Sequence, residues 1–217
     1  MDQKTIIQKT ADHVKQELLG EGSGYDWWHV RRVWQNAKHI GQVEGVDMFA
    51  VELAALLHDI ADWKLHGGDE TIGPKVAGDW MTSLQVSKQV IDRVQQIIAT
   101  MSFKGAGVKS EMRTIEGKVV QDADRLDALG AIGVGRAFAY GGFKHREMYS
   151  PELAPEMHQT ASAYKNSTGT TINHFYEKLF LLKDLMNTAT GKKLAEQRDQ
   201  FMHQFVDQFL AEGDGEK

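Results

Sequence analysis

Hydrophobic residues recur at helical spacing along most of the chain. Five segments carry apolar positions three or four residues apart, as expected for helices with one buried face. These positions are Val30, Val33, Trp34, Ala37 and Ile40; Leu53, Leu56, Leu57 and Ile60; Val90, Val94, Ile97 and Ile98, after Ser87 as a candidate N-cap; Ile172, Phe175, Leu179, Leu182 and Met186; and Leu194, Phe201, Phe205 and Phe209. Alternating strand patterns are lacking, apart from an ambiguous Val119-Val120. The pattern predicts an all-α protein.

Three segments interrupt the helical pattern and are expected to be loops. Residues 65–74 and 103–110 are rich in glycine, and residues 139–155 hold two of the three prolines. None of these segments has the length or low complexity of a linker, and no internal repeat is present. We therefore expect a single domain over residues 1–217, with a core at about 20–190 and a C-terminal helix at about 190–213.

Composition narrows the classes of partner. The chain has 217 residues, a net charge of −5 and no block of like charge, which argues against a specific nucleic-acid partner. It has no cysteine, so any bound metal must be held by His, Asp or Glu. No segment has the apolar core of a signal peptide or approaches the ~18 apolar residues of a membrane span. We expect a cytoplasmic protein without a membrane partner. Its aromatic content would permit a homodimer.

Several ionisable residues fall on otherwise apolar helices. His29 begins the face continued by Val33 and Ala37, and we expect it to be at least half buried. In AALLHDIADWK, His58 and Asp59 end the most apolar helix of the chain.

Three acids crowd the segment VVQDADRLDALGAIG, which is expected to form one helix over residues 119–133. They are Asp122, Asp124 and Asp127. Because carboxylates are rarely buried without a partner, these acids indicate an arginine-paired network or a bound cation. For Asp122 and Asp127, pairing with Arg125 or Arg136 is the simpler expectation. Two neutral imidazoles and two carboxylates would suit a divalent transition metal with water in the remaining positions.

The order His29, then His58-Asp59, then Asp124 resembles the H…HD…D signature of the HD-domain superfamily of metal-dependent phosphohydrolases. The surrounding segments YDWWHVRRVW, ALLHDIADWK and VVQDADRLDALGAIGVGRAFAYGG are similar to a bacterial branch of small single-domain HD proteins, and so is STGTTINHFYEKLFLLKDLMNTATG. Some members of this branch are described as nucleotide pyrophosphohydrolases. The resemblance covers roughly residues 10–210 and implies an HD-domain helical bundle with a metal site in the core of the helices.

The resemblance also implies roles for individual residues. Its four metal-ligand positions are occupied by His29, His58, Asp59 and Asp124. Among the three clustered acids, only the resemblance selects Asp124. Asp62 matches a position that carries an acidic general acid or base in some relatives.

Phosphoryl transfer also requires cationic and polar groups that hold the phosphates. The candidates are Lys64 and Arg125 as catalytic groups, and Arg32, Lys104, His66, Asn173 and His174 as substrate-binding groups. Each cation could instead pair with Asp62, Asp122 or Asp127, and Lys104 and His66 could simply be exposed to solvent. His174 could instead make a polar contact within the helical packing.

The expected reaction is hydrolysis of a small nucleotide with one divalent metal. Manganese is the first choice, and Ni, Co, Fe, Zn or Mg are the others. A nucleoside triphosphate would be cleaved to monophosphate and pyrophosphate. The alternatives are a nucleotidase or other phosphomonoesterase with the same site, a two-iron oxygenase, and a non-catalytic nucleotide sensor. The two-iron site would need further histidines, and only His66 lies between the HD pair and Asp124.

Overall fold

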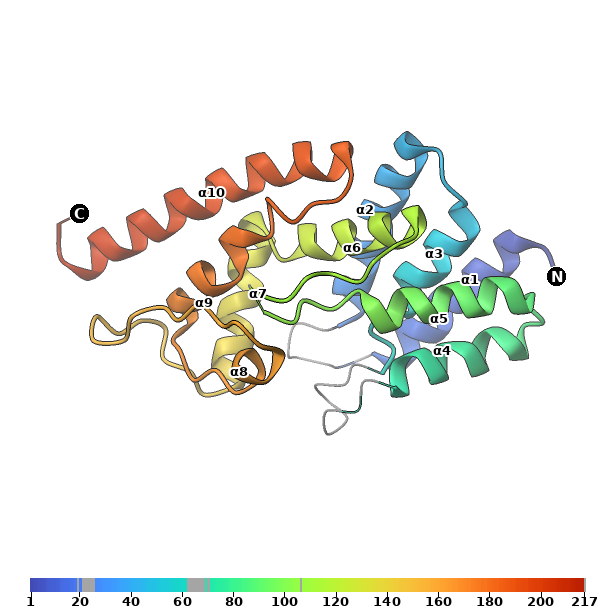
Figure 1. Cartoon of the computed structure of the whole chain (residues 1–217), viewed down its shortest axis with the longest axis horizontal. Helices are drawn as coiled ribbons and strands as arrows, with labels where there is room; N and C mark the ends of the chain where they lie inside the picture. The colour runs from blue at the N-terminus through green and yellow to red at the C-terminus, as the bar shows by residue number, and fades with distance from the viewer. Residues whose placement is uncertain (19, 21–25, 62–68, 70, 106, 217) are drawn as a thin grey trace. The chain divides into compact units, whose positions relative to one another are not determined.

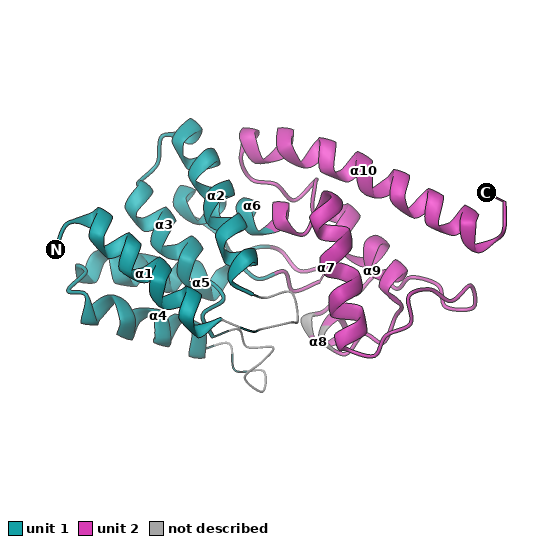
Figure 2. Cartoon of the chain, turned by 180° about the vertical axis from the view of Figure 1, so that it is seen from behind, with its two compact units in different colours: residues 1–102, 110–124 teal, residues 103–109, 125–217 magenta. Residues whose placement is uncertain are grey.

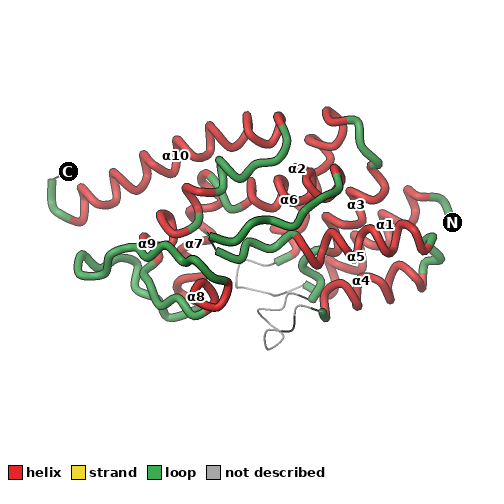
Figure 3. Tube along the Cα trace, in the orientation of Figure 1, coloured by secondary structure: helices red, strands yellow, loops and turns green. Residues whose placement is uncertain are grey.

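The structure is a computed structural model that describes residues 1–18, 20, 26–61, 69, 71–105 and 107–216. These residues form helices and loops without a strand, which confirms the prediction of an all-α protein (Figures 1 and 3). The chain divides into two compact units (Figure 2). Unit 1 comprises residues 1–102 and 110–124, and unit 2 comprises residues 103–109 and 125–217. None of the helices in the described part is both long and apolar enough to cross a membrane.

The helices follow one another along the chain, and a long loop at residues 144–160 separates α7 from α8. In unit 1 they are α1 (Gln3–Glu17), α2 (Trp27–Glu44), α3 (Met48–Leu57), α4 (Ile72–Ser83), α5 (Lys88–Thr100) and most of α6 (Ile115–Asp127). Unit 2 continues with α7 (Gly130–Phe143), α8 (Ala161–Lys165), α9 (Thr171–Glu177), the 3₁₀ helix η2 (Leu179–Leu181) and α10 (Ala189–Gly213). The bounds of α10 agree with the C-terminal helix expected at about 190–213.

Helix α3 forms the centre of unit 1. It packs against α1, α2 and α5, and Leu53, Leu56 and Leu57 are completely buried. Burial of each leucine side chain contributes ~1.5–3 kcal/mol to stability. The Asp47 side chain caps the first turn by accepting hydrogen bonds from the backbone N–H groups of Phe49 (3.1 Å) and Ala50 (3.5 Å). This helix is therefore a rigid apolar support for the residues that follow it.

Aromatic side chains form the core of unit 2. The ring of Phe138 on α7 lies 6.4 Å from Phe175 on α9, and 5.9 and 5.8 Å from Phe205 and Phe209 on α10. Phe201 was expected on the same face but is 43% exposed. Its neighbour Met202 is buried instead. Since successive residues of a helix point about 100° apart, burial of Met202 turns Phe201 outward.

Two of the expected helices are interrupted. The segment 172–186 ends as an α-helix at Glu177 and continues as the separate turn η2, with Lys178 at φ −143° and ψ −57° between them. Leu179 and Leu182 are nevertheless buried, so the apolar spacing conceals the break. The helix expected over residues 119–133 breaks between Asp127 and Gly130, where Gly130 has φ +71°. The ambiguous Val119-Val120 pair is helical, within α6.

Two of the expected loops are partly helical. The loop expected at 139–155 begins only after Phe143. One of its two glycines serves helix packing, since a Cβ at Gly141 would collide with the Thr171 hydroxyl. Helix α4 has no counterpart among the expected elements. It takes up residues 72–74 of the loop expected at 65–74, of which 65–68 and 70 lie outside the described residues.

Candidate metal centre

His29 is fixed by the start of α2. The Asp26 side chain accepts a hydrogen bond from the His29 backbone N–H at 2.8 Å and caps the helix. The neighbouring Val30 and Val33 are completely buried, and His29 is also 0% exposed. The expectation that His29 is at least half buried is therefore confirmed. The Asp-x-x-His spacing gives the histidine a defined position at the first turn.

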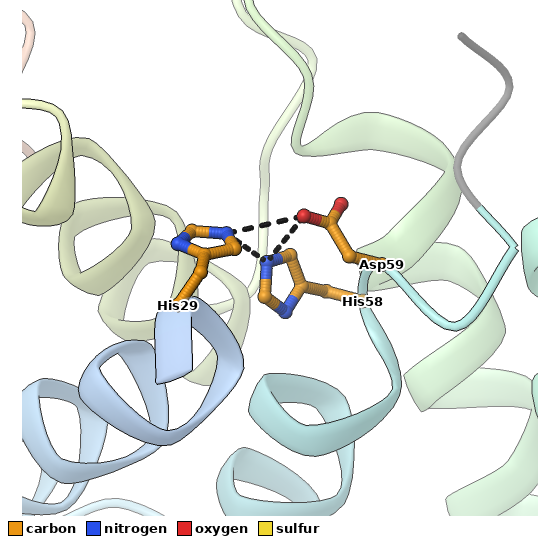
Figure 4. Close-up of side chains that lie close together, drawn as sticks. All are labelled: His29, His58 and Asp59. Carbon is orange, nitrogen blue, oxygen red and sulfur yellow. Dashed lines mark hydrogen bonds and ion pairs between the residues drawn. The ribbon is translucent and has the colours of Figure 1, made fainter. Parts of the chain in front are cut away.

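His58 and Asp59 directly follow the buried helix α3 (Figure 4). The His58 Nδ1 lies 2.8 Å from the Ala55 carbonyl oxygen, to which it donates. In a neutral ring this contact places the only ring proton on Nδ1 and leaves the lone pair on Nε2. That Nε2 lies 3.2 Å from the Nε2 of His29. The Asp59 Oδ2 completes the triangle, at 3.1 Å from His29 Nε2 and 3.3 Å from His58 Nε2.

Asp124 reaches the same atoms from α6. Its Oδ1 lies 3.6 Å from His29 Nε2 and 3.9 Å from His58 Nε2. The four residues singled out by the H…HD…D pattern therefore meet within unit 1. The next acid on this helix, Asp127, instead forms an ion pair with Arg136 at 3.2 Å within unit 2, as the simpler expectation had it. Asp122 is completely buried.

The donor atoms have the separations that a divalent ion requires. Bonds of about 2.0–2.2 Å to ligands at right angles place neighbouring donor atoms about 3 Å apart. The three contacts among His29, His58 and Asp59 measure 3.1–3.3 Å. Among the described residues, these three form the one group of three or more His, Asp or Glu close enough to hold an ion. The mixed nitrogen and oxygen donors suit a transition metal.

The charges of the site attract a cation. Burial alone lowers the pKa of His58, but the carboxylates of Asp59 and Asp124 outweigh burial and raise this pKa to about 9. Burial likewise raises the pKa of Asp59, yet His58 and His29 outweigh it and hold the pKa well below its usual range. The two carboxylates therefore favour a positive charge among the four side chains, which either a proton or a metal ion can supply.

The residues predicted to be catalytic or substrate-binding are distributed over both units and the undescribed segments. Asp62, Lys64 and His66 lie outside the described residues. Arg32 is half-buried on α2, one turn after His29, in unit 1.

The other four predicted residues belong to unit 2. Arg125 is 7% exposed and donates to the Leu185 carbonyl. Asn173 is buried and donates to the Leu153 carbonyl at 2.9 Å. Both side chains thus have a structural contact. Lys104 and His174 are half-buried.

Sequence reasoning missed two groups that position the histidines. The Asp26 cap could have been identified, since an aspartate stands directly before the helical pattern in YDWWHV. The Ala55 carbonyl could not, because every residue carries one and only the fold selects it. The first orients His29 through the helix start, and the second orients the His58 ring.

Comparisons with known proteins agree with this arrangement. The HD domain family matches residues 27–129, which include all four candidate ligands. The Bacillus subtilis protein YpgQ is 45% identical over 198 residues, covering 90% of this chain and 87% of YpgQ. A solved structure of YpgQ in complex with ADP has a TM-score of 0.71 at 38% identity, over 94% of this chain and 97% of that one.

Two further solved structures cover nearly the whole chain. A Lactobacillus plantarum protein has a TM-score of 0.87 at 37% identity, over 99% of this chain and 100% of that one. An HD-superfamily hydrolase from Bacillus thuringiensis has a TM-score of 0.74 at 44% identity, over 98% of this chain and 99% of that one.

Proposed function

Because this chain belongs to the HD domain family and is an HD-superfamily hydrolase, we propose that it cleaves a nucleoside triphosphate to a monophosphate and pyrophosphate. The observation that carries the proposal is the meeting of two imidazoles and two carboxylates at one point of unit 1. The ADP found in the YpgQ structure supports a nucleotide as the ligand.

We propose that His29, His58, Asp59 and Asp124 hold one divalent ion, with manganese as the first choice. When bound, such an ion polarises a phosphate oxygen and lowers the pKa of a water molecule. The protein contributes rigidity, since the buried end of α3 and the Ala55 carbonyl fix the His58 ring. Asp124 is about a third exposed at its side chain, which leaves one side of the cluster accessible to substrate.

Asp62 is the proposed proton acceptor. It follows His58 by four residues and would take the proton of the attacking water or position that water. Arg32, Lys64, Lys104 and His66 are proposed to bind phosphate oxygens.

Two of the proposed roles are limited by structural contacts. Arg125 already donates to the Leu185 carbonyl, but a guanidinium carries five N–H donors, so it retains the capacity to bind a phosphate. Asn173 already donates to the Leu153 carbonyl, and we propose that Asn173 and His174 both contact the substrate. The two-iron alternative gains no support, because the described residues contain one suitable donor group.

The test is a hydrolysis screen with separate detection of phosphate and pyrophosphate. Nucleoside mono-, di- and triphosphates are incubated with Mn²⁺, Mg²⁺, Co²⁺ or Ni²⁺ and either the wild type or Asp59→Ala. The proposal expects pyrophosphate from triphosphates, and none with the variant. Release of phosphate without pyrophosphate would instead indicate a nucleotidase or another phosphomonoesterase. The absence of any product with every metal would contradict a nucleotide substrate.

A further inference from the structure

Helix α3, with the sequence MFAVELAALL, contains one polar residue, Glu52. The other nine residues are apolar and seven of them are buried, so a carboxylate at this position needs an explanation. Its Oε2 accepts a hydrogen bond from the indole Nε1–H of Trp34 on α2 at 2.8 Å. Both residues are half-buried, so water competes only partly for this bond.

Helices α2 and α3 form a hairpin. Residues 45–47 join them, and α2 ends at Gly45, which has φ +68°. At the opposite end of the hairpin, His29 near the start of α2 meets His58 and Asp59, which follow α3 (Figure 4). The turn and the candidate metal ligands therefore lie at opposite ends of the same helix pair.

The Trp34–Glu52 bond lies between the turn and the ligands. Trp34 follows His29 by five residues along α2, and Glu52 precedes His58 by six residues along the other helix. At a rise of about 1.5 Å per residue, both separations are roughly 7–9 Å. Because the separations match, the indole bond and the contact between the histidines belong to one register of the hairpin.

The apolar contacts of α3 do not fix this register by themselves. Hydrophobic attraction has no direction, and three of the seven buried residues are alanines, which interlock less than larger side chains. A hydrogen bond is directional, so the Trp34–Glu52 bond resists sliding and rotation of the helices. The donor atoms of His29, His58 and Asp59 lie 3.1–3.3 Å apart. Since a metal site requires its ligands to be placed within about 0.5 Å, even a small slip would impair it.

We propose that Trp34 and Glu52 are positioning residues of the metal centre. Their bond fixes the register of the hairpin and thereby holds His29 against the ligands that follow α3. Both residues act through the backbone of their helices, since each lies more than one turn from the nearest ligand. The effect on metal affinity rests on the proposed function, whereas the placement of the two histidines in metal-free protein does not.

Four substitutions in the full-length protein separate the bond from charge and from stability. Trp34→Phe removes the donor, and Glu52→Leu removes the acceptor. Glu52→Gln removes the charge but keeps a carbonyl oxygen that accepts a hydrogen bond. The matched control is Trp80→Phe, which removes another indole bond of unit 1, from Trp80 Nε1 on α4 to Thr10 Oγ1 on α1 at 3.0 Å. Neither α1 nor α4 carries one of the four candidate ligands.

The test has two readouts. Chelator-treated protein is titrated with Mn²⁺ by calorimetry, and the NOE between the His29 and His58 rings, whose centres lie 5.2 Å apart, is measured without metal. Trp34→Phe and Glu52→Leu should each weaken the NOE and weaken Mn²⁺ binding about tenfold, the lower end of the effect of groups that orient metal ligands. Glu52→Gln and Trp80→Phe should keep the NOE and bind Mn²⁺ within about twofold of the wild type.

The outcomes distinguish this proposal from the proposed function. An NOE of wild-type intensity in Trp34→Phe and Glu52→Leu overturns the proposal, and so does Mn²⁺ affinity equal to that of the wild type. Equal weakening by Trp80→Phe overturns it because a general loss of stability would then explain the effect. Equal weakening by Glu52→Gln overturns it because charge would explain the effect. Absence of Mn²⁺ binding by the wild type would contradict the metal centre, and the NOE comparison in metal-free protein would then decide this proposal alone.

Discussion

Two histidines, one in each unit, respond in opposite ways to their surroundings. His58 in unit 1 has its pKa raised to about 9, whereas the pKa of His174 in unit 2 is lowered to about 3. Burial lowers both values, so the difference in sign comes from the neighbouring charges. Asp59 and Asp124 flank His58, and Lys178 and Arg146 lie near His174.

The comparison shows that neighbouring charges decide the direction in which the pKa of a buried histidine shifts. Carboxylates around an imidazole leave a deficit of positive charge, which a divalent metal can fill. Cations around an imidazole keep it neutral and favour an anion. A reaction on a nucleotide needs both a cation and groups that hold phosphates.

The largest expected effect is on the reaction rate, and it separates metal binding from catalysis in unit 1. Asp62→Asn should keep the metal and lose about 10²–10⁴ of the rate, since this is the usual contribution of general acid–base catalysis. Metal content is measured by atomic emission and the rate by pyrophosphate release. The matched control is Asp79→Asn, which makes the same change at an exposed position of α4 and should leave the metal content and the rate unchanged. An unchanged rate in metal-loaded Asp62→Asn would remove Asp62 from the mechanism.

A smaller effect is expected from the buried pair of unit 2. Glu177→Gln removes the carboxylate that lies 3.6 Å from His158 and should lower the free energy of unfolding by about 1–3 kcal/mol, as for a buried polar group that loses its partner. Urea unfolding at pH 7 measures this loss. The exposed Glu212→Gln should stay within about 0.5 kcal/mol of the wild type. Equal stability of the Glu177 and Glu212 variants would show that the contact between Glu177 and His158 does not contribute to stability.

The smallest effect concerns pH. The pKa of His174 is lower in the folded protein than the ordinary 6.5, so only the unfolded chain takes up this proton as the pH falls from 6.5 toward 3. The contribution of His174 to stability is therefore complete above pH 6.5 and decreases below it. His174→Gln should lose less stability than the wild type between pH 7 and 5, measured by urea unfolding with a chelator. Parallel curves for this variant, the wild type and the exposed His39→Gln would contradict the lowered pKa.

The sequence predicted the helical class and the C-terminal helix, but not every break between helices. Apolar spacing continues through Lys178 because the 3₁₀ turn also directs Leu179 inward. The end of α7 was expected to be a loop because of its glycines. The close packing that Gly141 permits involves Thr171, which is far away in the sequence.

The candidate site was predicted unevenly for the same reason. A family motif identified Asp124, which helical geometry alone could not distinguish from Asp122. His158 and Glu177 belong to no motif and lie 19 positions apart, so only the fold brings them together. Local pattern thus predicts elements, a motif predicts the metal set, and the pairing of distant charges needs the structure.

The central claim is that the carboxylate-flanked histidines of unit 1 bind a divalent cation. Calorimetric titration of chelator-treated protein with Mn²⁺ tests it most directly, using the wild type, Asp59→Ala and the exposed Asp92→Asn. We predict one ion per chain for the wild type and Asp92→Asn, and affinity at least about a hundredfold weaker for Asp59→Ala. Binding by Asp59→Ala as tight as that of the wild type would contradict the claim.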